Sequence, residues 1–188
     1  WLGGAIYGFF YAPLVITGLH HMFLAVDFQL MGSSLKGTYL WPIVAISNIC
    51  QGSAAFGAWL IYKRRKMAKE EGLALTSGVS AFLGVTEPAM FGVNLPLKVP
   101  FFAAICTSGI LGAVIGANRV LGNVGVGGVP AFISIQSKYW YIYIPVILLA
   151  MILPAVLTVV FSKFTKVKAK EMVENPDCLL YTSPSPRD

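Results

Sequence analysis

The sequence predicts an all-α polytopic membrane protein, made of transmembrane helices and at least one re-entrant hairpin. Hydrophobic side chains make up 56% of the 188 residues and charged ones only 12%, half the ~25% of ordinary soluble domains. The mean hydropathy is +0.72, and apolar runs of membrane-spanning length recur along the chain. This composition excludes a disordered chain, a disulfide-rich module and, despite a net charge of +6, a nucleic-acid binder.

The predicted elements follow from five apolar runs. Four of them are long enough to span a bilayer: residues 4–26, 39–62, 99–117 and 142–161. The fifth, 73–97, is interrupted by glycines, prolines and Glu87. The glycine-rich stretch 122–130 is expected to be irregular. It lacks the Walker lysine and a preceding strand, so no phosphate-binding loop is expected there.

Two clusters of basic residues indicate the topology. They comprise Lys63, Arg64, Arg65, Lys66 and Lys69 after the second run, and Lys163, Lys166, Lys168 and Lys170 after the last. Positive charge marks the cytoplasmic side, so an even number of crossings must separate the clusters. Of the three runs between them, 73–97 is expected to enter and leave on the same side, because Pro88 disfavours a continuous helix. Non-helical backbone at membrane depth needs polar surroundings, which predicts a cavity at Glu87.

Two acidic residues, Asp27 and Glu87, lie beside apolar sequence, away from the predicted cytoplasmic loops and the C-terminal tail. Ionisable groups in such places cost a few kcal/mol or more and generally serve a function. Glu87 is therefore a predicted functional residue. Asp27 is open to two interpretations, either an interfacial residue at a helix end or part of a site.

Four other polar residues are candidates to face a cavity: His20, His21, Asn48 and Gln51. On one continuous helix, His20 would share a face with Asp27, and two adjacent histidines cannot both pack on one side. Metal binding is not expected, because neighbouring helical positions diverge by about 100° and no further ligand follows at zinc-site spacing. Asn48 and Gln51 either hold helices together or offer hydrogen bonds to a hydroxyl-rich substrate.

Small and aromatic residues are assigned to packing and anchoring. The spacings Gly4-xxx-Gly8 and Gly112-xxx-Gly116 allow helices to approach closely. Aromatic residues at the ends of runs are predicted to form an interfacial belt. They are Trp41, Tyr139, Trp140, Tyr141 and Tyr143.

These residues alone predict a transporter whose cavity is lined by histidine, glutamate and amide side chains. Neutral, polyhydroxylated molecules are one class of substrate that suits such a lining. Cys50, Cys106 and Cys178 lie too far apart in the sequence to suggest a redox pair or a metal site, and no cofactor is expected. Because the chain begins inside an apolar run, we expect it to be part of a longer polypeptide.

Several blocks resemble one family in the same order. LGVTEPAMFGVNL (83–95) resembles the G-[IV]-T-E-P signature of the membrane-embedded enzyme IIC component of sugar phosphotransferase systems, in the glucose, sucrose and β-glucoside superfamily. YAPLVITGLHHMFLAVDFQLM (11–31) resembles its histidine-bearing segment, WPIVAISNICQGSAAFGAWL (41–60) its amide-bearing helix, and GVGGVPAFISIQSKYW (125–140) its glycine-rich connection. Within the superfamily the blocks most resemble trehalose-specific permeases, with sucrose permeases next.

The resemblance implies a site and a reaction. Enzyme IIC binds and translocates a disaccharide while a phosphocysteine on the partner enzyme IIB phosphorylates it; enzyme IIA is a further partner, and this chain alone lacks the phosphoryl donor. Glu87 and His20 map to residues that contact sugar hydroxyls, and Glu87 could also act as a general base. The supporting candidates are His21, Asp27, Asn48, Gln51 and Asn94.

The resemblance also implies a setting, a multi-pass protein of the bacterial cytoplasmic (inner) membrane in contact with lipid. It would form a homodimer through an N-terminal region that this chain lacks. Residues 1–170 would be the C-terminal part of the enzyme IIC transmembrane domain and 171–188 a cytoplasmic tail, of which 178–188 looks like a non-native scar.

Three alternative functions stay open. The first is a sucrose or β-glucoside permease of the same system. The second is a proton-coupled secondary sugar transporter in which Glu87 and His20 relay protons. The third is a structural membrane subunit without a substrate.

Overall fold

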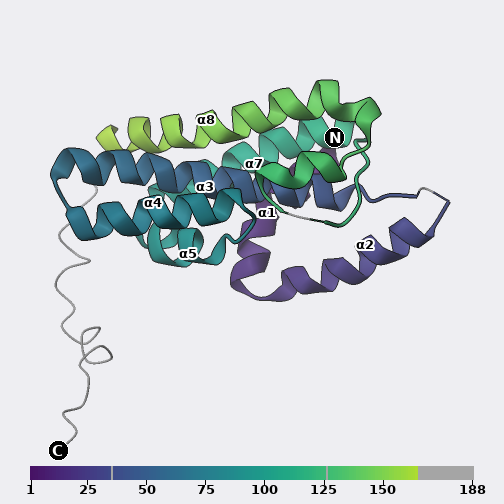
Figure 1. Cartoon of the computed structure of the whole chain (residues 1–188), viewed down its shortest axis with the longest axis horizontal. Helices are drawn as coiled ribbons and strands as arrows, with labels where there is room; N and C mark the ends of the chain where they lie inside the picture. Colours follow the sequence, from purple (N-terminus) through teal and green to yellow (C-terminus); the bar gives the residue numbers. More distant parts are fainter. Residues whose placement is uncertain (35, 126, 165–188) are drawn as a thin grey trace, which may run out of the picture.

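The computed structural model is a bundle of long helices lying side by side (Figure 1). It describes residues 1–34, 36–125 and 127–164. Three helices are long and apolar enough to cross a membrane. They are α3 (Leu40–Arg65), α7 (Val99–Ala117) and α8 (Trp140–Phe164). The spans predicted at 39–62, 99–117 and 142–161 are therefore confirmed as helices, within a few residues at each end.

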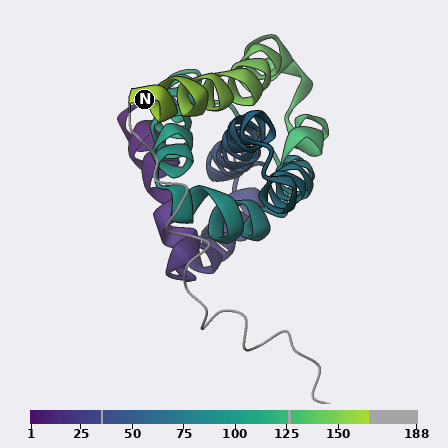
Figure 2. The ribbon, with the colours of Figure 1, turned by 90° about the vertical axis from the view of Figure 1, so that its left-hand side faces the viewer.

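Helix α3 is the centre of the bundle, and Figure 2 shows it end-on with other helices around it. It packs against α8, α7, α1 (Leu2–Ile16) and α4 (Ala68–Phe82), and every residue from 42 to 55 is buried. A helix buried on all sides has no solvated face on which to place its polar residues. Ser53 accordingly donates a hydrogen bond to the Met151 carbonyl oxygen (2.6 Å) and accepts one from the Ala155 N–H (3.1 Å), both on α8.

The first apolar run is not the single span that the sequence predicted. Helix α1 ends at Ile16, a short 3₁₀ turn η1 (Leu19–His21) follows, and α2 (Met22–Gly32) leaves in another direction (Figure 1). Gly18 makes the break, since its φ of 75° is a left-handed conformation that glycine adopts without steric cost. The helical-face relation expected between His20 and Asp27 does not apply, because His20 lies in the turn.

The interrupted run 73–97 folds into two limbs that pack against each other. Helix α4 is the first limb; the second comprises α5 (Glu87–Ala89), the π-helical turn η2 (Met90–Asn94) and α6 (Leu95–Leu97). The break lies at 83–86, earlier than expected. Pro88 sits in the first turn of α5, where its missing N–H would have no helical partner anyway. Membrane re-entry by this hairpin stays a prediction.

The ends of the helices agree with the parity expected from the basic clusters. Arg64 and Arg65 of α3 line one pocket together with Lys163 of α8, so the described parts of both clusters lie at the same end of the bundle. Leu97 lines a second pocket beside Tyr62 of α3, so the hairpin returns to the end from which it left. The remaining lysines of the second cluster and the predicted tail, 171–188, lie outside the described residues.

The glycine-rich connection between α7 and α8 is irregular in its described residues, as predicted. Gly122 forms isolated antiparallel bridges with Thr38 and with Ile135. Two 3₁₀ turns, η3 (Val129–Ser134) and η4 (Ser137–Tyr139), then lead into α8. The connection thus ties the start of α3 to the start of α8.

The two small-residue motifs pack against each other, joining α1 to α7. A Cβ atom added to Gly4 would lie 2.2 Å from the Gly112 carbonyl oxygen, and one added to Gly8 would lie 2.4 Å from that of Ser108. Neither distance is sterically possible, so only glycine permits this approach. The close helix packing predicted from the Gly-xxx-Gly spacings is confirmed.

We expect Gly4→Ala to lower the thermal unfolding midpoint of the detergent-purified protein, because the new methyl group would force α1 and α7 apart. Gly3→Ala is the matched control: a Cβ at Gly3 meets nothing within 4 Å, and alanine favours a helix over glycine by about 1 kcal/mol. Equal midpoints for the two variants would contradict the packing of α1 on α7.

Candidate functional site

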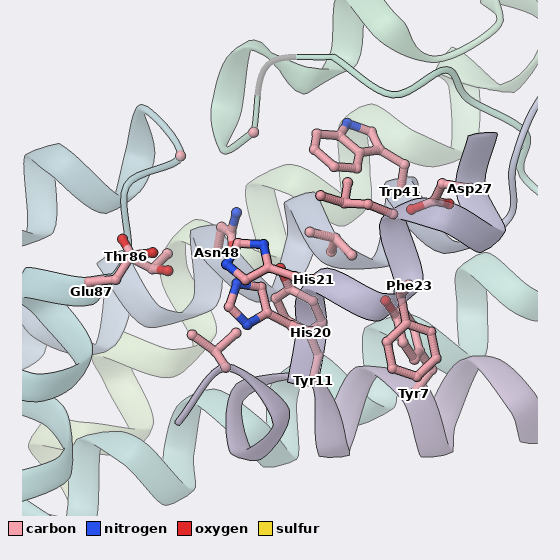
Figure 3. A pocket seen from close by; sticks show the side chains of 15 residues that line it. Tyr7, Tyr11, His20, His21, Phe23, Asp27, Trp41, Asn48, Thr86 and Glu87 are labelled. Carbon is pink, nitrogen blue, oxygen red and sulfur yellow. The ribbon is translucent and has the colours of Figure 1, made fainter. Parts of the chain in front are cut away.

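A cavity of about 200 Å³ lies where the two helix breaks approach each other (Figure 3). Its walls come from α1, from η1 and α2, from the start of α3, from the break at 83–86 with Glu87, and from the glycine-rich connection. These segments are far apart in the sequence, so the cavity is a product of the tertiary fold. Among the described residues, no group of three or more side chains could hold a metal ion.

Polar side chains from both breaks meet at this cavity. Figure 3 shows Glu87 and Thr86 on one side and the two histidines facing them from the other. The rings of His20 and His21 lie against each other, with centroids 3.9 Å apart, and both histidines line the cavity together with Glu87. A carboxylate acceptor and imidazole groups thus converge on one space.

Local hydrogen bonds shape the break that carries Glu87. The Ser80 hydroxyl donates to the Val85 carbonyl oxygen (3.1 Å), and the Val85 N–H donates to the Ser80 carbonyl oxygen (3.1 Å). The Met90 N–H donates to the Thr86 carbonyl oxygen (2.8 Å). These bonds satisfy backbone groups that a continuous helix would have paired, and they leave the Glu87 side chain exposed at the cavity.

Glycines bring the α7–α8 connection onto the same break. Gly84 has a φ of 105°, and a Cβ on it would lie 2.9 Å from Gly127 Cα; a Cβ on Gly127 would lie 3.1 Å from Asn48 Nδ2. Gly84 and Gly127 both line the cavity, a role that the sequence does not predict. The sequence shows glycines in both segments, but this does not indicate that the two segments are in contact.

The structure separates the two amides that share one face of α3. Asn48 lines the cavity. Gln51 instead accepts two hydrogen bonds from the Asn94 amide, at its backbone oxygen (2.9 Å) and at Oε1 (2.7 Å). Gln51 and Asn94 are almost fully buried, do not line this cavity, and join α3 to the hairpin.

Aromatic rings form the end of the cavity opposite Glu87. Tyr7, Phe23 and Trp41 lie on this side in Figure 3, and the rings of Tyr7 and Phe23 are 5.1 Å apart. Trp41, which the sequence assigns to an interfacial belt, lines the cavity wall in the structure. Tyr7 Oη and Trp41 Nε1 are buried and have no hydrogen-bond partner among the described residues, although buried polar atoms are normally paired.

Asp27 lies at the edge of the cavity and is almost fully buried, with 2% of its surface exposed. Its carboxylate accepts a hydrogen bond from the Thr38 hydroxyl. The structure thus gathers His20, His21, Asp27, Asn48 and Glu87 around one cavity.

Comparison with known proteins identifies the family. The family described as "Phosphotransferase system, EIIC" matches residues 1–109. The chain belongs to this family. With its three long apolar helices, this EIIC chain is a multi-pass membrane protein, and the family resemblance of its sequence blocks is confirmed.

Relatives named for two different sugars match the chain. The chain is 52% identical over 164 residues to the trehalose-specific EIIBC component of Bacillus subtilis and 46% identical over 158 residues to that of Escherichia coli. It is 50% identical over 147 residues to the sucrose-specific EIIBC component of Staphylococcus xylosus. These matches cover 87%, 84% and 76% of the chain, but only 34%, 33% and 30% of the relatives. The chain spans about a third of their length, and no solved structure matches it.

We expect Asn94→Ala to destabilise the protein, because it removes two hydrogen bonds and leaves the Gln51 amide oxygen buried without this partner, at a cost of about 1–3 kcal/mol. Asn118→Ala is the control. Its side-chain amide donates to the Val114 carbonyl oxygen (2.8 Å) at the exposed end of α7, where water can replace the lost amide. The thermal unfolding midpoint in detergent is measured for both variants. A midpoint of Asn94→Ala no lower than that of Asn118→Ala would contradict a structural role for the Gln51–Asn94 hydrogen bonds.

Proposed function

We propose that this chain is the sugar-binding part of a phosphotransferase permease that takes up trehalose across the bacterial cytoplasmic membrane. The observation that carries this proposal is the cavity between two helix breaks, where Glu87 faces His20 and His21. Residues 1–170 would be the C-terminal part of the EIIC domain, with the hairpin around Glu87 re-entering the membrane. A homodimer would form through a preceding region.

The cavity lining suits a neutral sugar. A carboxylate accepts hydroxyl hydrogen bonds strongly, so Glu87 would bind one edge of a sugar ring. His20, His21 and Asn48 offer donors and acceptors for further hydroxyls. The second ring of a disaccharide would then lie against the aromatic rings of Tyr7 and Trp41 in the cavity wall.

The reaction would be a phosphoryl transfer from the partner EIIB, which the names of the EIIBC relatives favour. A sugar hydroxyl oxygen attacks the phosphorus atom, the bond to the EIIB cysteine sulfur breaks, and the thiolate leaves. Glu87 would accept the proton of the attacking hydroxyl as general base. EIIA would recharge EIIB, and the charged ester product cannot return through hydrocarbon.

The choice of trehalose over sucrose is supported by two trehalose-specific relatives, one of them at 52% identity. Sucrose is the second candidate, with a relative at 50% identity. The two disaccharides differ in ring size and hydroxyl geometry, and such differences in a pocket shift preference by roughly 1–3 kcal/mol. Competition between the two sugars distinguishes these assignments.

We expect Glu87→Gln in the complete permease to lower phosphoenolpyruvate-dependent formation of trehalose phosphate by about 10²-fold or more, because an amide cannot accept the proton. The measurement uses membranes supplied with the soluble phosphotransferase components and radiolabelled trehalose. Glu71→Gln is the control, since Glu71 lies in the first turn of α4, away from the cavity lining.

Three outcomes would contradict this function. Uptake of unmodified sugar that ignores phosphoenolpyruvate and stops when the membrane potential is abolished would identify a proton-coupled carrier. Phosphorylation of sucrose or a β-glucoside in preference to trehalose would change the substrate. Full activity in Glu87→Gln would remove Glu87 from the site.

We expect Trp41→Ala to raise the KM for trehalose about tenfold, because the variant loses the aromatic surface of the cavity wall. Trp41→Phe keeps an aromatic ring and should raise the KM less. Trp140→Ala is the control, because the Trp140 indole bonds the Ile135 carbonyl oxygen (3.0 Å) outside the cavity. Steady-state phosphorylation across a range of trehalose concentrations gives the KM values. Equal KM values for Trp41→Ala and the wild type would exclude the aromatic end from binding.

A further inference from the structure

Helix α2 is the limb that follows the His20–His21 turn, and it is only loosely packed. Asp27 is its one buried residue, while Met22 is 68% exposed and Phe28 60% exposed. Phe23 packs against Tyr7 of α1, but no apolar residue of α2 is fully buried within this chain. Whatever holds this helix in place also holds the two histidines that precede it.

The described contacts of α2 with the bundle include one buried hydrogen bond. The Thr38 hydroxyl donates to the Asp27 carboxylate across the turn between α2 and α3. Thr38 is fully buried. A weaker contact, from the Val124 N–H to Met31 Sδ (3.4 Å), joins the far end of α2 to the α7–α8 connection.

Thr38 is itself held by three further hydrogen bonds, to Leu40 and to Gly122. Its hydroxyl oxygen accepts a hydrogen bond from the Leu40 N–H (3.0 Å) at the start of α3. Its backbone N–H donates to the Gly122 carbonyl oxygen (2.8 Å), and its carbonyl oxygen accepts from the Gly122 N–H (3.1 Å). Gly122 in turn bridges to Ile135 before α8. Thr38 is thus a rigid point to which α2 is attached.

Thr38 is also connected to two further walls of the cavity, α3 and the α7–α8 connection. Helix α3 begins two residues later and presents Trp41 and Asn48, while the connection that contains Gly122 presents Gly127, which lies against Gly84 beside Glu87. The Asp27–Thr38 bond therefore joins the histidine side of the cavity to the segments that support the Glu87 side.

We propose that Asp27 and Thr38 are positioning residues for the sugar site, and that Asp27 does not itself bind the sugar. Their hydrogen bond fixes the position of α2, and therefore keeps His20 and His21 facing Glu87 across the cavity. This inference rests on the proposed sugar-binding function. It replaces the interpretation of Asp27 as a sugar ligand, because its side chain is almost fully buried and already accepts the Thr38 hydroxyl.

The test is a set of variants in the complete permease that either keep or remove the hydrogen bond. Asp27→Ala and Thr38→Val remove it, whereas Asp27→Asn retains an acceptor oxygen and Thr38→Ser retains the hydroxyl. We expect each removal to raise the KM for trehalose about tenfold, the size of a lost buried hydrogen bond. The two retaining variants should stay within about twofold of the wild type, since their contact survives.

The double variant Asp27→Ala/Thr38→Val isolates the pair. Because both substitutions break the same bond, we expect its KM to be no higher than that of the worse single variant. A merely structural role would reduce the amount of folded permease and its thermal midpoint but leave the KM of the folded fraction unchanged. The amount of folded permease and its thermal midpoint are therefore measured for every variant together with its KM.

Two kinetic patterns would overturn the proposal. A raised KM in Asp27→Asn with a normal KM in Thr38→Val would show that Asp27 contacts the sugar directly. If the rise in KM of the double variant equals the product of the rises in the two single variants, the two residues do not act through one bond.

A measurement without sugar separates this proposal from the proposed function. Spin labels at Leu19 and Val85, exposed positions next to the two breaks, report the distance between them. We expect Thr38→Val to broaden that distance distribution and Thr38→Ser to preserve it. An unchanged distribution in Thr38→Val would overturn the positioning role even if the wild type phosphorylates no trehalose.

Discussion

Backbone polar groups freed by a break in a helix inside a membrane protein must find partners within the protein, and the rest of this structure depends on that constraint. Two such breaks among the described residues border the cavity, one at Gly18 and one at 83–86. Each is closed locally by tight turns, and both face the same cavity. Because these turns pair the backbone groups within each break, the side chains of His20, His21 and Glu87 remain available to the cavity.

The surrounding elements are arranged to support these breaks. Residues 42–55 of α3 are all buried. Within this stretch Asn48 lines the cavity, and Gln51, one turn later, bonds the hairpin through Asn94. Glycine contacts bring the α7–α8 connection against Gly84. Tyr7 and Tyr11 of α1 line the cavity, and the close packing of α1 on α7 through Gly4 and Gly8 holds that helix in place.

The features predicted from the sequence are those set by local composition. Hydropathy located α3, α7 and α8, and the cost of a charge beside apolar sequence singled out Glu87, which lines the cavity. The break at Gly18 was missed because an apolar run does not reveal the φ of one glycine. Trp41 was assigned to the membrane interface, as is typical of aromatics at helix ends. Its place in the cavity wall follows from long-range packing, as does the pairing of Asp27 with Thr38.

The central claim is that the sugar lies between the two breaks, and equilibrium binding of radiolabelled trehalose to the purified complete permease, without a phosphoryl donor, tests it most directly. The account predicts that Glu87→Ala and the double variant His20→Ala/His21→Ala each abolish measurable binding, while Asn118→Ala at the exposed end of α7 binds like the wild type. Undiminished trehalose binding after removal of the side chains of either break would contradict it.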